Sequence, residues 1–156
     1  MTEALTHLNH KGEAHIVDVG DKPATARRAV ARATLEARPT TVAAIAGGGL
    51  KKGDALAVAR IAGIMAAKKT SELIPLCHPI ALDRVQVAIS AEAGTITILA
   101  TAETHDRTGV EMEAMTAVSV AALTLYDMAK GIDRAMRVSA VELMEKSGGK
   151  SGDFKR

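Results

Sequence analysis

A predicted long helix, with acidic residues at both ends of an alanine-rich apolar rod, is the feature that most restricts what this chain can fold into. Thr108-Gly109 supplies a start and Gly131 a stop, and the stretch extends to Asp133. Small and aliphatic side chains recur between these points at helical spacing. Packing explains those side chains, whereas the acidic residues need another explanation.

Two of these acidic residues, Glu113 and Asp127, lie on one side of the predicted helix. At a rise of about 1.5 Å per residue they are separated by roughly 21 Å. Two carboxylates of one chain cannot hold one small substrate across that distance. Either they do separate work, or a second chain brings them together. Asp127 and Lys130 are surface neighbours on the helix, and by themselves they indicate no more than a stabilising ion pair.

The composition is typical of one soluble domain. A chain of 156 residues can bury a real core. The single cysteine, Cys77, excludes an internal disulfide and any multi-cysteine zinc or iron–sulfur site. No apolar stretch approaches the roughly 20 residues that cross a bilayer, and the N-terminus has charges and histidines where a signal peptide would be apolar. We therefore expect a cytoplasmic protein.

Aromatic residues are nearly absent, which limits both the partners and the core. With one Phe, one Tyr, no Trp and a net charge of +2, the chain offers little on which bases could stack, so nucleic acid is not an expected partner. The core must consist of Ala, Val, Ile, Leu and Met. Such a core favours close packing but limits what one small chain can bury, so we expect a homo-oligomer.

The first half of the chain predicts a tail, a strand and two helices. Residues 1–13 lack periodicity and are predicted to be a flexible tail before a single domain over residues 14–156. That domain opens with a short β-like segment at His15–Val19. Alternation in Ala26–Ala37 favours a strand, although its alanines suit a helix, and we predict the strand. Two helices should follow, from Pro39 to the glycines at 47–49 and from a cap at Asp54 toward Pro75.

The second half completes an α+β pattern. Two alternating runs, Ile80–Glu92 and Thr95–Glu103, are joined by Ala93-Gly94 and predict a β-hairpin. The long helix follows, and Met136–Glu145 alternates again as a last strand. This order is the split βαβ pattern of a ferredoxin-like sandwich, an antiparallel sheet with helices on one face.

Two glycine-rich segments contain lysines, and each has two interpretations. Gly47–Asp54 joins a glycine loop to Lys51, Lys52 and a helix start, so it is either an anion site or a solvated connection. Lys146–Asp153 is not a P-loop, because Met144 stands where the first glycine is required and too few residues follow to form the helix. It is either a mobile lid over a ligand or a frayed basic terminus.

A histidine lies in a rigid turn between two prolines. Pro75 and Pro79 restrict the backbone around Cys77 and His78. A fixed imidazole suits general acid–base catalysis, and a structural histidine that caps a carbonyl is the equal alternative. Cys77 is expected to pack as a small apolar group. We predict no metal site here, because adjacent side chains diverge and no third ligand is evident.

Two further groups of basic residues have a simple default interpretation. The clustering of His7, His10 and His15 near the N-terminus is interpreted as incidental. Arg27-Arg28 is by default a solvated pair, with a phosphate clamp as the alternative.

Four segments resemble, in the same order, the motifs of molybdenum cofactor biosynthesis protein C, the MoaC family. They are Lys68–Pro79, Thr108–Ala114, Tyr126–Met128 with Lys130, and Lys146–Phe154. The similarity extends from about Gly12 to the C-terminus. Residues 27–50 and the predicted hairpin are only loosely characteristic of the family.

The resemblance implies a ferredoxin-like subunit in a hexamer built as a trimer of dimers, with the active site at the dimer interface. It also implies a lyase, cyclic pyranopterin monophosphate synthase. This enzyme converts a cyclised dihydro-GTP intermediate, made by a radical S-adenosylmethionine enzyme, into a pyranopterin with a cyclic phosphate and releases pyrophosphate. The reaction moves protons on nitrogen and carbon and needs cations where pyrophosphate leaves. It needs no redox cofactor, and whether Mg²⁺ accompanies the triphosphate stays open.

The resemblance also assigns roles. Lys52 and Lys130 become the catalytic pair, with Asp127 positioning Lys130, and Lys51 replaces Lys52 if the loop register differs by one. The remaining site residues are expected to bind substrate: Arg27 and His78 at the triphosphate, Glu111 and Glu113 at the guanine-derived face, Lys146 closing the pocket, and Cys77 and Met112 beside them. A non-catalytic oligomeric protein that binds a phosphorylated ligand, or scaffolds pathway enzymes, through the same lysines is the alternative.

Overall fold

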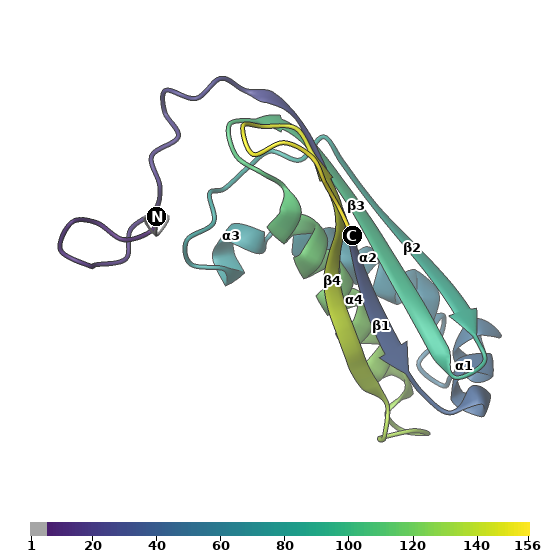
Figure 1. The fold of residues 1–156 in the computed structure, drawn as a ribbon. Coiled ribbons are helices and arrows are strands. Elements are labelled where there is room, and N and C mark those ends of the chain that lie inside the picture. Colours follow the sequence, from purple (N-terminus) through teal and green to yellow (C-terminus); the bar gives the residue numbers. More distant parts are fainter. Residues whose placement is uncertain (1–5) are drawn as a thin grey trace.

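An antiparallel sheet with helices packed on one face forms the body of the protein (Figure 1). The computed structural model describes residues 6–156, and within them the strands run in the order β2-β3-β1-β4-β5, every neighbouring pair antiparallel. The elements are β1 (Thr25–Glu36), α1 (Pro39–Ala46), α2 (Ala55–Ala67), α3 (Thr70–Leu73), β2 (Arg84–Glu92), β3 (Thr95–Asp106), α4 (Glu111–Ala129), β4 (Arg137–Ser147) and β5 (Phe154–Lys155). The predicted α+β fold, compatible with a ferredoxin-like arrangement, is confirmed.

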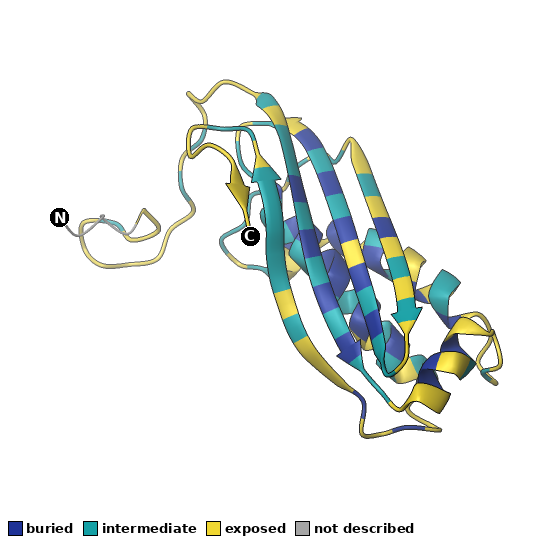
Figure 2. Ribbon diagram, turned by 45° about the vertical axis from the view of Figure 1, so that its right-hand side comes forward, coloured by how far each residue is buried: buried dark blue, intermediate teal, exposed yellow. Residues whose placement is uncertain are grey.

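The central strand β1 shows why the ambiguous segment forms a strand. Its alanines alternate with larger polar residues, so Ala29, Ala31 and Ala33 all face the helices and are fully buried. Figure 2 shows this alternation as stripes along the central strands. Arg28 and Arg32 lie on the other face of the sheet and pair with glutamates of the neighbouring strands. A helix would have placed Ala31 on the side opposite Ala29 and Ala33, so these three side chains could not all have been buried on one face.

The helices approach each other closely because small residues meet at their contact. Ala114, Ala117 and Ala121 of α4 are fully buried. Helix α2 crosses α4 at Gly63, where an added Cβ would lie 2.9 Å from the carbonyl oxygen of Ala117. No larger residue fits there without moving a helix. Because the core has almost no aromatic side chains, the backbones of α2 and α4 lie close together.

Several element boundaries differ from those predicted. The helix that starts after Asp54 ends at Ala67, and a separate turn of helix, α3, follows, where the hydroxyl of Thr70 donates to the carbonyl of Ala67 at 2.9 Å. The long helix spans Glu111–Ala129 and is shorter than Thr108–Asp133. Strand β2 begins at Arg84, four residues after Ile80, and β5 was not predicted from the sequence.

The predicted β-like segment at His15–Val19 is wrong, because the segment has no strand partner. It extends away from the sheet with the residues before it. The His15 amide donates to the His7 carbonyl at 3.0 Å, and Leu8 forms an isolated bridge with Ala14, so residues 7–15 turn back on themselves. The flexibility predicted for residues 1–13 remains a prediction, and residues 1–5 of that tail lie outside the described part of the chain. Among the described residues, none of the helices combines the length and apolar character needed to cross a membrane.

The contact at Gly63 gives the first prediction. Gly63→Val should lower the free energy of unfolding by about 1–3 kcal/mol, because the added methyl groups overlap the α4 backbone. Thermal or urea unfolding measures the loss. Ala43→Val, at an exposed position of α1, is the control and should cost about 0.5 kcal/mol, the usual helix-propensity difference. Equal losses at both positions would show that helix propensity, and not this contact, sets the effect.

Candidate functional site

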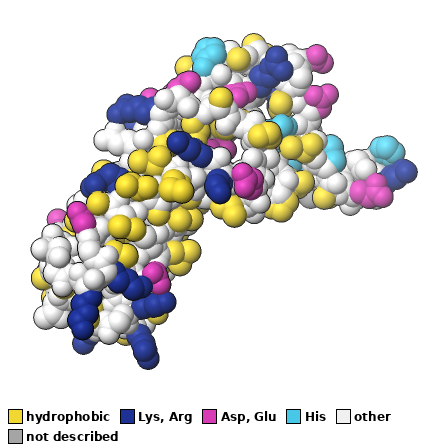
Figure 3. Space-filling model, turned by 180° about the vertical axis from the view of Figure 1, so that it is seen from behind, with side chains coloured by type: hydrophobic (Ala, Val, Ile, Leu, Met, Phe, Trp, Pro, Cys, Tyr) yellow, Lys and Arg dark blue, Asp and Glu magenta, His cyan; other side chains and the backbone are white. Residues whose placement is uncertain are grey.

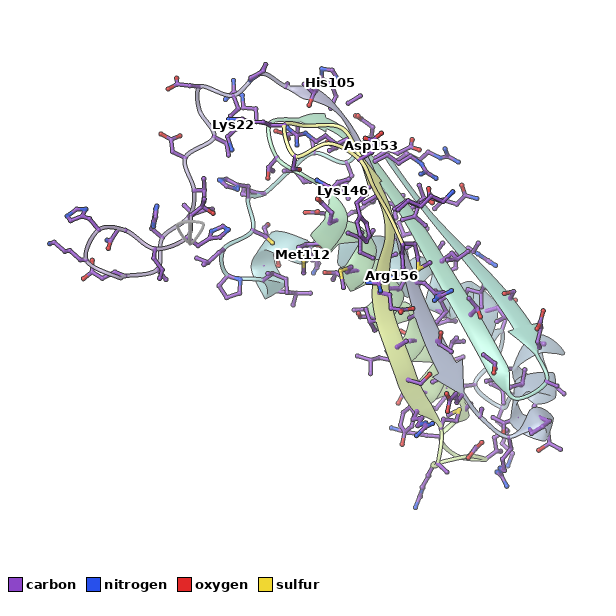
Figure 4. All side chains as sticks on the ribbon, viewed as in Figure 1. Lys22, His105, Met112, Lys146, Asp153 and Arg156 are labelled. Carbon is purple, nitrogen blue, oxygen red and sulfur yellow. The ribbon has the colours of Figure 1, made fainter. Side chains whose placement is uncertain are left out.

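A cleft of about 470 Å³ lies beside the N-terminal end of α4. Its walls come from the segment before β1, the turn after α3, the first turn of α4 with the residues that lead into it, and the end of β4. Figure 4 labels one residue from each of three of these parts, Lys22, Met112 and Lys146. Seven residues predicted to form the site line this cleft: Arg27, Cys77, His78, Glu111, Met112, Glu113 and Lys146.

Glu113 gives the cleft an unusual carboxyl group. Its side chain lies in the first turn of α4 and the residue is only 4% exposed. Burial raises the pKa of Glu113 to about 7, a hydrogen bond from its own backbone lowers it, and the nearby charge of Glu111 raises it further. Burial, with the charge of Glu113, also raises the pKa of the Cys77 thiol. The cleft therefore holds a carboxyl that can gain or lose a proton near neutral pH, and a thiol that stays protonated there.

Three of the basic side chains in the cleft, those of Arg27, His78 and Lys146, have partners within the protein. The Arg27 guanidinium donates from Nε to the Asp106 carbonyl at 3.3 Å and from Nη2 to the Arg107 carbonyl at 3.2 Å. His78 Nε2 lies 2.6 Å from the carbonyl oxygen of Val17. Lys146 Nζ lies 3.8 Å from Glu111 Oε1 and hydrogen-bonds the Ser151 hydroxyl. These weak partners fix the direction of each side chain but leave donors for a ligand.

A second cluster, Lys52 with Asp127 and Lys130, lies at the opposite end of α4. Lys52 Nζ lies 2.9 Å from Asp127 Oδ2 and donates to the Asp127 carbonyl at 2.8 Å. Lys130 Nζ lies 2.8 Å from the other carboxylate oxygen. Hydrogen bonds from Lys130 and then Lys52 lower the pKa of Asp127 to about 2, and Asp127 raises the pKa of Lys130. One carboxylate thus holds two ammonium groups together, all half-exposed.

The loop that carries Lys52 is an ordered turn. Gly53 has a φ of +99°, which glycine adopts without strain, and its amide donates to the Leu50 carbonyl at 3.0 Å. Asp54 then caps α2 by accepting from the Ala57 amide at 3.0 Å. This geometry turns Lys52 toward α4. Lys51 is exposed and makes no ion pair with the residues that the structure describes.

One chain therefore separates the predicted site residues into two groups. The second group lies at the end of α4 that is far from the cleft and consists of Lys51, Lys52, Asp127 and Lys130. The helix rises by roughly 1.5 Å with each residue between this group and Glu113. The separation of roughly 21 Å expected between Glu113 and Asp127 follows from α4 being continuous between them. Within one chain the two groups of residues are therefore too far apart to contact one small ligand.

Several cleft residues were not predicted from the sequence. Thr108, Gly109, Leu76 and Ser151 lie inside the motif segments, so reading those segments whole would have found them. The wall before β1 is different, because Thr6, His7, Val17, Val19 and Lys22 form no recognisable pattern. The structure separates His7, which lines the cleft, from His10 and His15, which do not. The three histidines therefore do not form one site.

No group of three or more His, Cys, Asp or Glu side chains in residues 6–156 is arranged to hold a metal ion.

The sequence profile of the MoaC family matches residues 16–149. The chain belongs to the MoaC family. A protein of Parvibaculum lavamentivorans named cyclic pyranopterin monophosphate synthase is 56% identical over 153 residues, 97% of this chain and 96% of its own. A protein of Mycobacterium tuberculosis named cyclic pyranopterin monophosphate synthase 1 is 56% identical over 98% of this chain and 91% of its own. A protein of Roseiflexus named cyclic pyranopterin monophosphate synthase is 57% identical over 96% of each chain. The MoaC match includes both ends of α4, so the lysine cluster and all of the cleft lining except Thr6, His7 and Ser151 lie in the family region.

The raised pKa of Glu113 gives a prediction about stability. Between the unfolded value of about 4.5 and the folded value of about 7, the folded state holds a proton that the unfolded state has lost, so stability falls as pH rises through this range. Glu113→Gln removes this loss. From about pH 5 to pH 8 the wild type should lose roughly 3 kcal/mol relative to this variant, because one pKa unit corresponds to about 1.4 kcal/mol. Urea unfolding of both proteins at one protein concentration measures the difference.

Glu111→Gln is the matched control, since Glu113 still titrates in that variant. It should retain most of the wild-type pH dependence. The same pH dependence in wild type and Glu113→Gln would mean that the Glu113 carboxyl does not titrate in this range.

Proposed function

We propose that this protein is a cyclic pyranopterin monophosphate synthase of molybdenum cofactor biosynthesis. It converts the cyclised dihydro-GTP intermediate into cyclic pyranopterin monophosphate and releases pyrophosphate. The names of relatives that match nearly the whole chain support this proposal. The observation that carries it is the pair of ammonium groups that Asp127 holds at one end of α4, together with a cleft of acids and cations at the other.

The lysine cluster supports proton transfer. Rearranging the purine-derived ring requires a group that donates protons and one that accepts them. Asp127 raises the pKa of Lys130, so Lys130 is present as the protonated acid, and substrate contacts that weaken this ion pair would make the proton easier to release. Lys52, the other member of the pair, shares the same carboxylate within 2.9 Å. The ion pairs therefore favour Lys52, and not Lys51, as the catalytic lysine of this loop.

The cleft supports binding of a charged nucleotide-like substrate. Glu111 and Glu113 offer acceptors to the N–H groups of a guanine-derived ring. Arg27, His78 and Lys146 line the same cleft and match a triphosphate. Cys77 and Met112 add apolar contact. The proposal includes no redox cofactor, and a Mg²⁺ ion carried by the triphosphate is compatible with it.

We further propose that two chains build each complete site, within a homohexamer made of three dimers. The separation of the two residue groups along α4 requires a second chain if they serve one substrate. An exposed apolar surface on the helical side supports assembly: Val58, Ile61 and Met65 of α2 and Leu123 of α4 are 43 to 60% exposed (Figure 3). The substrate comes from a radical S-adenosylmethionine enzyme, and the reaction takes place in the cytoplasm.

Pyrophosphate release tests the function directly. Purified protein supplied with the cyclised intermediate should release pyrophosphate and form the cyclic phosphate. Binding of the intermediate without release would favour the alternative, a non-catalytic binding protein.

Lys52 and Lys51 form a matched pair for the catalytic assignment. Lys52→Ala should lower turnover by roughly 100-fold or more, because it removes one ammonium of the pair from the reaction, a typical effect for general acid–base groups. Lys51→Ala should change turnover by less than roughly threefold. Steady-state pyrophosphate release measures both, and thermal unfolding checks that both variants fold. The opposite ranking would move the catalytic role to Lys51.

Mixed dimers test the shared site. Glu113→Ala and Asp127→Ala should each be inactive, and dissociating, mixing and reassembling them should restore activity to roughly a quarter of wild type. With random pairing half of the dimers are mixed, and one of the two sites in each mixed dimer carries neither substitution. If subunit exchange is confirmed by mass spectrometry and no activity returns, both residues act within one chain or in separate roles.

A further inference from the structure

The Arg27 guanidinium is held on one side by main-chain carbonyls. It lies at the beginning of β1, where this strand pairs with the end of β3, and it donates to the carbonyls of Asp106 and Arg107 at 3.3 and 3.2 Å. These two bonds use one hydrogen of Nε and one of Nη2. Three of its five N–H donors remain, two of them on Nη1. One donor on Nη1 and one on Nη2 point in the same direction, so an anion in the cleft could accept from both.

The glycine turn between β4 and β5, residues 148–153, covers the other side of the guanidinium. At Gly149, with a φ of +80°, an added Cβ would overlap Arg27 Nη1 and lie 2.8 Å from Cζ. At Gly148, with a φ of +90°, a Cβ would overlap the carbonyl oxygen of Ala26 and lie 3.3 Å from its carbon. The main chain of the turn therefore rests directly on Arg27 and on the residue before it.

The position of this turn is fixed from both ends. The Gly148 amide donates to Asp153 Oδ1 at 3.3 Å, which closes the turn. Beyond it, Phe154 pairs with Lys146 across strands β5 and β4. Lys146 itself bonds Ser151 within the turn. Lifting the turn to make room for a side chain at Gly149 would break these contacts. Such a side chain would therefore displace the guanidinium.

We propose that Gly149 is a positioning residue for Arg27, which holds the guanidinium against the Asp106 and Arg107 carbonyls so that its free donors bind the phosphate end of the substrate. The inference rests on the proposed function for the identity of that substrate. The chemistry that it predicts, binding of a polyphosphate through Arg27, applies to any ligand with such a group.

Gly152 is the matched control. Its φ of +72° is close to that of Gly149, but an added Cβ would meet nothing within 4 Å. Alanine at either position carries a similar backbone strain. Only at Gly149 does it also push on Arg27. The difference between the two variants therefore isolates the contact with the guanidinium.

The experiment compares Gly149→Ala, Gly152→Ala, Arg27→Ala and the double variant Arg27→Ala with Gly149→Ala. Calorimetry measures binding of inorganic pyrophosphate, and steady-state kinetics measures KM and kcat. Gly149→Ala should weaken pyrophosphate binding and raise KM by roughly tenfold, the size of one lost charged hydrogen bond, with a smaller change in kcat. Gly152→Ala should change both by less than roughly threefold. The double variant should bind no more weakly than Arg27→Ala, because Gly149 acts through Arg27.

Equal effects of Gly149→Ala and Gly152→Ala would overturn the proposal, as would a double variant in which the two losses multiply. If the wild type binds no pyrophosphate, crystal structures of the two variants decide, and an undisplaced guanidinium in Gly149→Ala overturns it. Failure of the proposed function gives a different result. The wild type would then release no pyrophosphate from the cyclised intermediate, while the ranking of the variants in pyrophosphate binding would still test Gly149.

Discussion

The close approach of α4 to the sheet and to α2 is the contact on which the rest of the structure depends. Ala29, Ala31 and Ala33 of β1 belong to one buried cluster with the alanines of α4. Gly63, which also lies against Val87 of β2, brings the backbone of α2 against that of α4 beside it. Small side chains bury little apolar area each, but they remove the freedom of α4 to tilt or slide. The helix thereby becomes a spacer of fixed length between two chemical groups.

The two ends of this spacer give the same functional group opposite properties. Glu113 is buried in the first turn of α4, where the helix dipole favours a negative charge by about 0.3–1 kcal/mol. Burial outweighs this contribution, since the rise of its pKa to about 7 corresponds to roughly 3 kcal/mol. Asp127 is half-exposed between two ammonium groups and its pKa falls to about 2. One carboxyl can therefore exchange a proton at neutral pH, whereas the other remains a fixed negative charge.

Local patterns predicted the elements well, and contacts distant in sequence were harder to predict. Alternation identified β1 and the hairpin, but no pattern indicated that α2 would end at Ala67, because the bond between Thr70 and Ala67 competes with helix continuation. The motifs contain His78 and Glu111, which line the cleft, yet the wall that includes His7 and Lys22 depends on how an irregular segment folds back. The choice between Lys51 and Lys52 likewise depends on a distant contact, because Lys52 bonds Asp127 of α4, which lies 75 residues later in the sequence.

The internal pairing of the site cations limits which ligands can bind. Arg27 donates to main-chain carbonyls, Lys146 lies 3.8 Å from Glu111, and His78 contacts Val17. A ligand with one negative charge would replace one of these partners, and the gain would be the difference between two similar contacts. A polyphosphate meets several of these cations at once, and after the first contact each further one forms within the same complex. The partners that orient the cations thus also select against small, singly charged anions.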